Sequence, residues 1–147
     1  MNDSCCQIDE IFYYGTFSIT MMADSIEHKF YESKCSQLTK ENEIRFAGII
    51  NESGKLIAGG FKPGIVPLEN NDSRLDDFME FASRISLRKD FDKTLGPINY
   101  IAARRDKLIL ISFPFPVSRF VLLISAEPTT DIEKIAKRVV AIFSDTS

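Results

Sequence analysis

Three apolar segments lie close together in the second half of the chain. They cover Ile98 to Arg105, Leu108 to Phe113 and Phe120 to Ala126, and short polar or proline-bearing breaks separate them. Short segments rich in β-branched and aromatic residues, with turn signals between them, predict a meander of strands. Because such a sheet must be covered by other elements, we expect the rest of the chain to pack on it.

A second pair of strand-like segments precedes the meander. Arg45 to Ile50 and Lys55 to Phe61 are joined by a four-residue turn that ends in Gly54, which predicts a β-hairpin. Glycines within these strands indicate a bulge or the close approach of another backbone; they are Gly48, Gly59 and Gly60. The loop that follows, Lys62 to Asp72, is long enough to indicate a function or mobility.

Capping signals predict three helices around these strands. Asp24 or Ser25, followed by Glu27, begins a first helix that ends near Lys40. Ser73 caps the second helix, with Asp76 three residues later. Thr130 and Glu133 form a capping box for the last helix, whose apolar stripe comprises Ile132, Ile135, Ala136, Val139, Val140 and Phe143.

The second helix has an unusually wide apolar stripe. Leu75, Phe78, Met79, Ala82 and Ile85 recur at three- and four-residue spacing. Phe81 widens the stripe to about 160°, where a surface helix needs only about 100°. Two interpretations stay open: a deeply packed core helix, or a helix that contacts both the sheet and a second surface.

Residues 1–22 differ from the rest of the sequence. They contain a segment of strong strand propensity from Ile11 to Ile19, but no partner strand follows at hairpin distance. Interrupting polar residues and two preceding acids argue against a signal peptide or a membrane span. The segment is an extra edge strand or, as we favour, a poorly ordered leader, with Met21 or Met22 as the functional start and 23–147 as a single domain.

Composition excludes several classes of protein. The 147 residues are 44% hydrophobic and 27% charged, which is typical of one globular domain, and the net charge of -3 argues against a nucleic-acid binder. The three cysteines, Cys5, Cys6 and Cys35, have no zinc spacing and two are adjacent. This usage indicates a reducing compartment, so we expect a cytoplasmic protein.

No catalytic constellation is visible. His28 is the only histidine and has no nucleophile motif near it, while the acidic residues do not converge as a metal site requires. We therefore expect no catalytic residue, cofactor or metal. Arg104, Arg105 and Lys107 form a small basic group that is more simply a solubilising turn than a phosphate contact. Phe115, in a proline-rich break between strands, either contacts a partner or folds down over its own sheet.

The order of elements, helix, strand, strand, helix, strand, strand, strand, helix, resembles the roadblock family of dynein light-chain-like modules. This family is related to longin and profilin-like domains, and the resemblance covers about residues 24–144. The strings Leu95-Gly96-Pro97 and Arg105-Asp106-Lys107 are similar to those of small archaeal proteins of unknown function.

The resemblance implies an α+β fold with a five-stranded antiparallel sheet in the order 2-1-5-4-3 and the topology α-β-β-α-β-β-β-α. The first and last helices would cover one face and the second helix the other. Members pair through the third strand and second helix, and act as non-enzymatic scaffolds or regulators, often of small GTPases.

For this chain the resemblance implies a homodimer and a small GTPase or other protein partner. An exposed edge strand beside a broad apolar helix supports such an interface. The residues expected there are Phe78, Phe81, Ile85, Tyr100, Ile101 and Ala103. The alternative is a small-molecule-sensing profilin-like or PAS-like domain, which the loop from Lys62 to Asp72 suggests.

Overall fold

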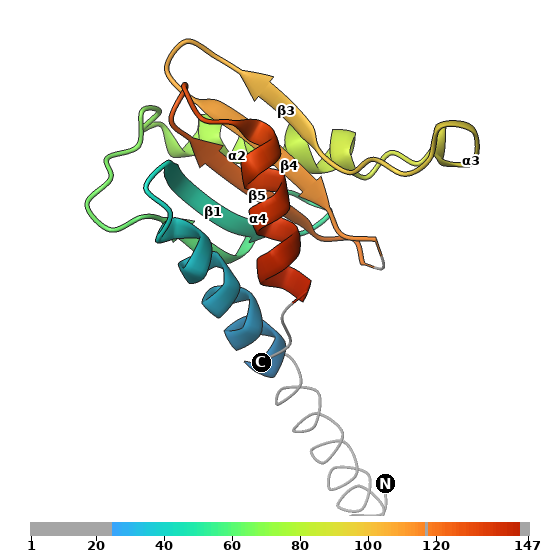
Figure 1. Cartoon of the computed structure of the whole chain (residues 1–147), viewed down its shortest axis with the longest axis horizontal. Coiled ribbons are helices and arrows are strands. Elements are labelled where there is room, and N and C mark those ends of the chain that lie inside the picture. The colour runs from blue at the N-terminus through green and yellow to red at the C-terminus, as the bar shows by residue number, and fades with distance from the viewer. Residues whose placement is uncertain (1–24, 117, 145–147) are drawn as a thin grey trace, which may run out of the picture. The chain divides into compact units, whose positions relative to one another are not determined.

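The chain folds around one antiparallel sheet (Figure 1). A computed structural model describes residues 25–116 and 118–144, so residues 1–22 and the cap expected at Asp24 lie outside the described residues. The sheet order is β2-β1-β5-β4-β3, as expected. Its strands are β1 (Ile44–Ile50), β2 (Leu56–Phe61), β3 (Ile101–Arg104), β4 (Ile109–Pro114) and β5 (Val121–Ala126).

Helices precede, interrupt and follow the strands. They are a helix over residues 25–39, α2 (Asp72–Ser86), the short α3 (Asp92–Leu95) and α4 (Ile132–Ser144). The chain divides after Phe30 into two compact units. Of the first unit, residues 25–30 are described and are helical, and all the other described residues belong to the second unit.

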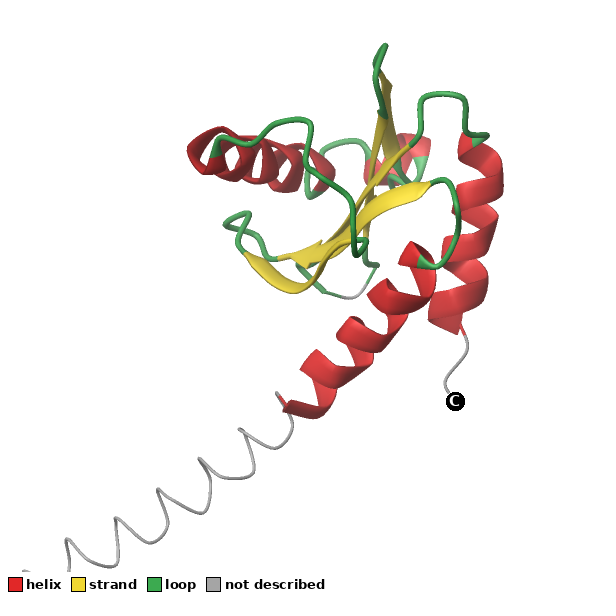
Figure 2. Ribbon diagram, turned by 90° about the vertical axis from the view of Figure 1, so that its left-hand side faces the viewer, coloured by secondary structure: helices red, strands yellow, loops and turns green. Residues whose placement is uncertain are grey.

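In the second unit, helices cover both faces of the sheet (Figure 2). The helix segment over residues 31–39 and α4 lie on one face, and α2 lies on the other. The central strand β5 is buried at all six positions, because helices cover it from both sides. The α+β class and the arrangement of the helices are therefore confirmed.

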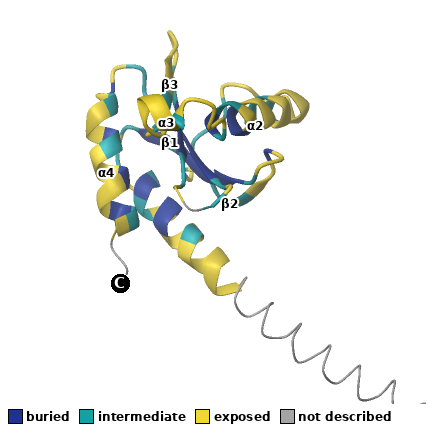
Figure 3. Cartoon of the chain, turned by 90° about the vertical axis from the view of Figure 1, so that its right-hand side faces the viewer, coloured by how far each residue is buried: buried dark blue, intermediate teal, exposed yellow. Residues whose placement is uncertain are grey.

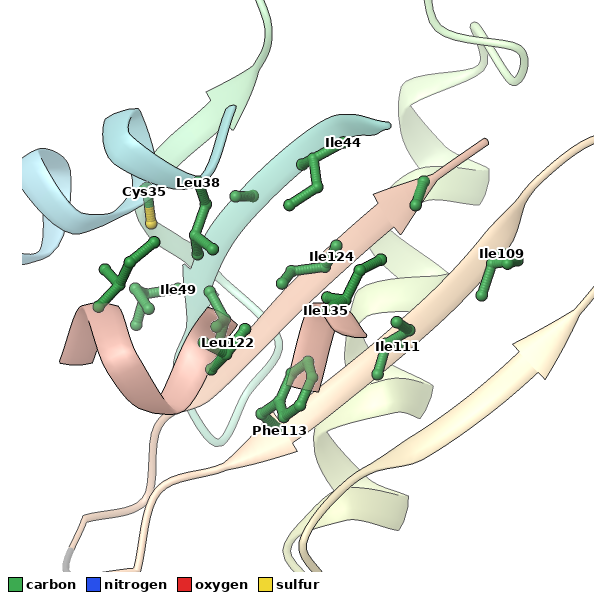
Figure 4. Packing of buried hydrophobic residues seen from close by; sticks show 14 of the residues in the cluster. Cys35, Leu38, Ile44, Ile49, Ile109, Ile111, Phe113, Leu122, Ile124 and Ile135 are labelled. Carbon is green, nitrogen blue, oxygen red and sulfur yellow. The ribbon is translucent and has the colours of Figure 1, made fainter. Parts of the chain in front are cut away.

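The larger core lies between the sheet and the helices of the first face (Figure 4). Cys35 and Leu38 reach it from the helix, and Ile135 reaches it from α4. The opposite core, under α2, is smaller. It consists of Phe46, Ile50, Ala82, Val121 and Leu123.

Two predicted helix caps are wrong. The Asn71 side chain, not that of Ser73, caps α2 by accepting a hydrogen bond from the Arg74 amide at 3.2 Å. Asp131, not Thr130, accepts from the amide of Glu133 at 3.0 Å at the start of α4. Asparagine and aspartate cap as well as serine and threonine do, so the pattern located both helix starts but not the capping residues.

The predicted stripe of α4 also needs a correction. Val140 is 65% exposed, whereas Ile142 is buried beside Ile135 and Val139. These three buried residues follow the spacing of four and three residues that one face of a helix requires. Val140 therefore points away from the core.

Strand β3 is shorter than predicted and begins at Ile101 instead of Ile98. Its ladder with β4 starts with Ile101 opposite Ser112, and the same register sets Asn99 opposite Pro114. Proline has no amide hydrogen to donate, so the ladder does not continue toward Ile98.

Candidate protein-interaction surface

The two edges of the sheet differ in how they are covered. On β2, the Gly59 amide donates a hydrogen bond to the Glu32 carboxylate at 2.8 Å. Gly59 also has a φ of 83°, and a side chain there would meet the Ala47 carbonyl at 2.2 Å. This confirms the close approach of another backbone at Gly59, whereas a side chain at Gly48 would meet only side chains and one at Gly60 nothing within 4 Å.

Strand β3 forms the other edge and is bare. Among the described residues, Ile101–Arg104 make their strand hydrogen bonds to β4 alone. Ala102 and Ala103 are exposed and small, so the edge is open to an approaching strand. Unpaired backbone groups on such an edge pair readily with another chain.

The register of β3 decides which of its side chains lie beside α2. Ile101 stands opposite Ser112 and Ala103 opposite Leu110, on the face of the sheet that α2 covers. Arg104 stands opposite Ile109 on the other face. There it donates to the carbonyls of Pro128 at 2.5 Å and Thr130 at 3.2 Å, ahead of α4.

Tyr100 also lies on the α4 face of the sheet. Its ring centroid is 5.7 Å from that of Phe113, and its hydroxyl donates to the Glu133 carboxylate. The hydrogen bond to Glu133 raises the pKa of Tyr100. The structure therefore separates Tyr100 from the other expected interface residues, which share the α2 side.

Small residues hold α2 against the sheet. Its buried positions are Ala82, Ser83 and Ser86, and the Ser83 hydroxyl donates to the Asn51 carbonyl in the β1–β2 turn at 2.7 Å. Gly54 of the same turn lies against the helix backbone, so close that a Cβ there would be 2.4 Å from Glu80 Cα. The role of Ser83 was not predicted, because the carbonyl that it binds is remote in sequence.

The larger apolar residues of α2 remain accessible (Figure 3). Phe78 and Ile85 are half-buried, and Phe81 is 55% exposed. The wide stripe is thus only partly used by the protein's own core. This favours the interpretation in which α2 also contacts a second surface.

Phe115 folds down on its own sheet. Its ring centroid lies 5.9 Å from that of Tyr31 and 5.4 Å from that of Phe143. It packs half-buried against the larger core, which is the intramolecular alternative expected for the proline-rich break.

Two surface cavities have volumes of about 270 and 420 Å³. The first lies between α4 and the turn before β1, where Glu43 faces Lys134. Backbone hydrogen bonding and the nearby charge of Lys134 lower the pKa of Glu43. The second lies beside the β1–β2 turn. Neither of these two cavities is lined by the loop from Lys62 to Asp72, which suggested ligand sensing.

Other chemistry is limited in the part of the chain that the structure describes. No three histidine, cysteine or acidic side chains come together there as a metal site would need. None of the helices within residues 25–116 and 118–144 is long and apolar enough to cross a bilayer. Cys35 is buried, and burial followed by the charge of Glu32 raises the pKa of its thiol to about 12.

A comparison with protein families identifies the family of this chain. The family described as "Family of unknown function (DUF6659)" matches residues 22–145. The chain belongs to DUF6659. No curated protein matches this DUF6659 member.

Solved structures similar to this DUF6659 member share its fold. The gliding protein MglB from Thermus thermophilus has a TM-score of 0.61 at 12% identity, covering 80% of this chain and 87% of that one. The Roadblock/LC7 domain from Streptomyces avermitilis gives 0.57 at 14%, covering 77% and 91%. Myxococcus xanthus MglB gives 0.54 at 16%, covering 82% and 96%. This DUF6659 member therefore has a roadblock-like fold.

Proposed function

We propose that the protein is a non-enzymatic, homodimeric interaction module that regulates or scaffolds a protein partner. The observation that carries this proposal is the bare edge of β3 beside the exposed Phe81 of α2. At the opposite edge the Gly59 amide already donates to the Glu32 carboxylate, which makes β3 the more open edge for pairing. The similarity to roadblock-like structures supports the same assignment.

A two-fold axis beside β3 would use both features at once. Two β3 strands related by such an axis run antiparallel, and the two sheets become continuous. The axis brings the exposed faces of both α2 helices together, with Ile101 and Ala103 between them. Because an isologous interface uses each residue twice, Phe81 becomes buried in both copies.

Charges at the interface test this proposal. Burying a whole phenylalanine side chain is worth about 1.5–3 kcal/mol. Since Phe81 is 55% exposed, its removal from two copies weakens the dimer by about 2–3 kcal/mol, or roughly 30- to 140-fold. We expect Phe81→Glu and Ile101→Glu to be folded monomers in size-exclusion light scattering. Val140→Glu, at a comparably exposed position on α4, should remain dimeric.

The dimer interface is wrongly assigned if both interface variants stay dimeric. Circular dichroism of each variant separates loss of dimer from loss of fold. A wild-type chain that is monomeric at every concentration would contradict the proposal as a whole.

A small GTPase is the partner class that the roadblock resemblance implies. We propose binding of such a GTPase in one nucleotide state, measured by calorimetry with purified small GTPases from the source organism loaded with GDP or a GTP analogue. Binding that differs between the two nucleotides supports a regulatory role. Failure of every GTPase to bind the dimer contradicts this part of the proposal and leaves the dimer itself intact.

A further inference from the structure

The connection between α2 and β3 forms an arm over residues 88–99. It leaves the end of α2, turns through α3 and returns to β3, and Figure 1 shows it extending away from the sheet. The hydrogen bonds that shape α3 join residues of the arm to one another, such as the Leu95 amide to the Phe91 carbonyl at 2.8 Å. Among the described residues, only the Arg88 amide ties this segment back, to the Ile85 carbonyl at the end of α2.

The tip of the arm carries an apolar pair with no cover. Phe91 is 66% exposed and Leu95 is 80% exposed. Neither belongs to a hydrophobic core of the protein. Two large apolar side chains displayed together on a projecting segment are a feature of contact surfaces.

Charge is distributed unevenly along α2 and the arm. The start of α2 presents the exposed carboxylates of Asp72, Asp76 and Asp77, for which the described structure shows no ion pair. The arm presents Lys89 and Lys93, also exposed and without an ion pair in the described part. Its other charges are the Arg88–Asp90 ion pair and Asp92, so its net charge is positive. Acidic residues at the start of α2 suit the positive end of the helix dipole. The dipole does not account for Lys89 in the same way, because Lys89 lies beyond the last turn of α2.

These opposite charges cannot meet within one chain. Asp76 and Ser86 are ten residues apart on α2, which separates them by about 15 Å at the rise of an α-helix. The arm then continues away from the helix end (Figure 1). A second copy of the chain, in contrast, can bring them together.

The two-fold axis proposed above sets the two α2 helices antiparallel. The end of α2 in one copy then lies beside the start of α2 in the other, so each arm begins next to the acidic first turns of the second helix. A stable interface takes roughly 20–30 residues from each side, more than a four-residue strand and one helix face provide. The arm adds the residues that this interface lacks.

We infer that the arm of each copy clasps the acidic start of α2 in the other copy. Lys89 and Lys93 face Asp76 and Asp77 of the second copy, and Phe91 and Leu95 become buried there. This inference rests on the proposed dimer and adds the part of the surface that fixes its orientation. Complementary charges mainly select the partner and the register, while the apolar pair adds affinity.

A charge exchange tests the clasp. Lys89→Glu with Lys93→Glu should raise the Kd of the dimer at least tenfold at low ionic strength, where exposed charges are least screened. Asp76→Lys with Asp77→Lys should do the same. The variant with all four changes should return to within threefold of the wild-type Kd, because the reversed charges again meet their opposites across the two copies.

Two further variants separate the clasp from general effects. Leu95→Asp should raise the dimer Kd at least tenfold without changing the circular dichroism spectrum. Val140→Asp and Lys137→Glu, exposed on α4, should leave the Kd unchanged. Sedimentation equilibrium over a dilution series measures each value.

A dimer whose Kd responds neither to the charge pairs nor to Leu95→Asp overturns the clasp but leaves the β3 and α2 interface standing. A four-residue variant that is as weak as the two pairs combined also overturns it. A monomeric wild-type chain overturns both proposals.

Discussion

Replacing Gly54 by alanine is expected to loosen α2 from the sheet. Gly54 has a φ of 82°, and its missing Cβ would stand 2.4 Å from Glu80 Cα and 2.5 Å from the Glu80 nitrogen. These are backbone atoms of α2, so a rotamer change cannot relieve the contact. Either the β1–β2 turn or the helix must move.

Gly64 supplies a matched control. Its φ of 86° is almost the same, but an added Cβ would meet nothing within 4 Å. Alanine at a left-handed position costs about 1–2 kcal/mol at either site. Overpacking adds about 1–3 kcal/mol at Gly54 alone. Replacing glycine by alanine also lowers the conformational entropy of the unfolded chain, which stabilises the protein. This stabilisation is common to both variants and cancels in the comparison.

We therefore expect Gly54→Ala to lose about 2–5 kcal/mol of unfolding free energy, and Gly64→Ala about 1–2 kcal/mol. Urea titrations followed by circular dichroism, at one fixed protein concentration, measure both. The reasoning is refuted if the two variants unfold with the same free energy. A shifted α2 should also weaken the dimer in Gly54→Ala but not in Gly64→Ala.

Two other sites give direct tests. Gly59→Ala should lose about 2–5 kcal/mol of unfolding free energy, because positive φ and a backbone clash combine, whereas Gly60→Ala should lose less than about 1 kcal/mol. Equal losses in a urea titration would contradict this. In a Cys5→Ser, Cys6→Ser background, the folded protein should resist iodoacetamide at pH 8, and rapid alkylation would show that Cys35 is accessible. The folded Cys35 thiol, with its pKa raised to about 12, keeps its proton in a range where a thiol of ordinary pKa, 9.0, ionises. Above pH 9.0 the thiol of the unfolded chain therefore ionises first, which lowers the free energy of the unfolded state. Stability should thus fall between pH 9 and 12, and less so in Cys35→Ala.

The strands could be predicted because their pattern is local. Alternating and continuous apolar segments located all five strands of the sheet, and Gly54 located the first turn. The strand order came from the family resemblance, since no local pattern states which strands become neighbours. The start of β3 was misplaced because it depends on Pro114, which lies on another strand.

The interaction surface could be predicted only in part. Phe81 was identified by the width of the helical stripe, and its exposure follows from the small residues that bring α2 close to the sheet. Ser83 could not be recognised from sequence, because its acceptor, the Asn51 carbonyl, lies 32 residues away. Tyr100 was predicted in the interface together with residues of α2, but its side chain packs on the opposite face of the sheet, because the facing of a strand residue depends on register.

The hydrogen bond between Glu32 and Gly59 has a consequence for assembly. A sheet with two open edges could add copies without limit and form a filament. In this protein one amide of the β2 edge, that of Gly59, already donates to a carboxylate of the preceding helix, whereas the β3 edge has no such contact among the described residues. Once two β3 strands pair, both outer edges of the ten-stranded sheet are β2 edges. We therefore expect the Glu32 side chain, far from the proposed interface, to disfavour further growth by strand pairing at β2.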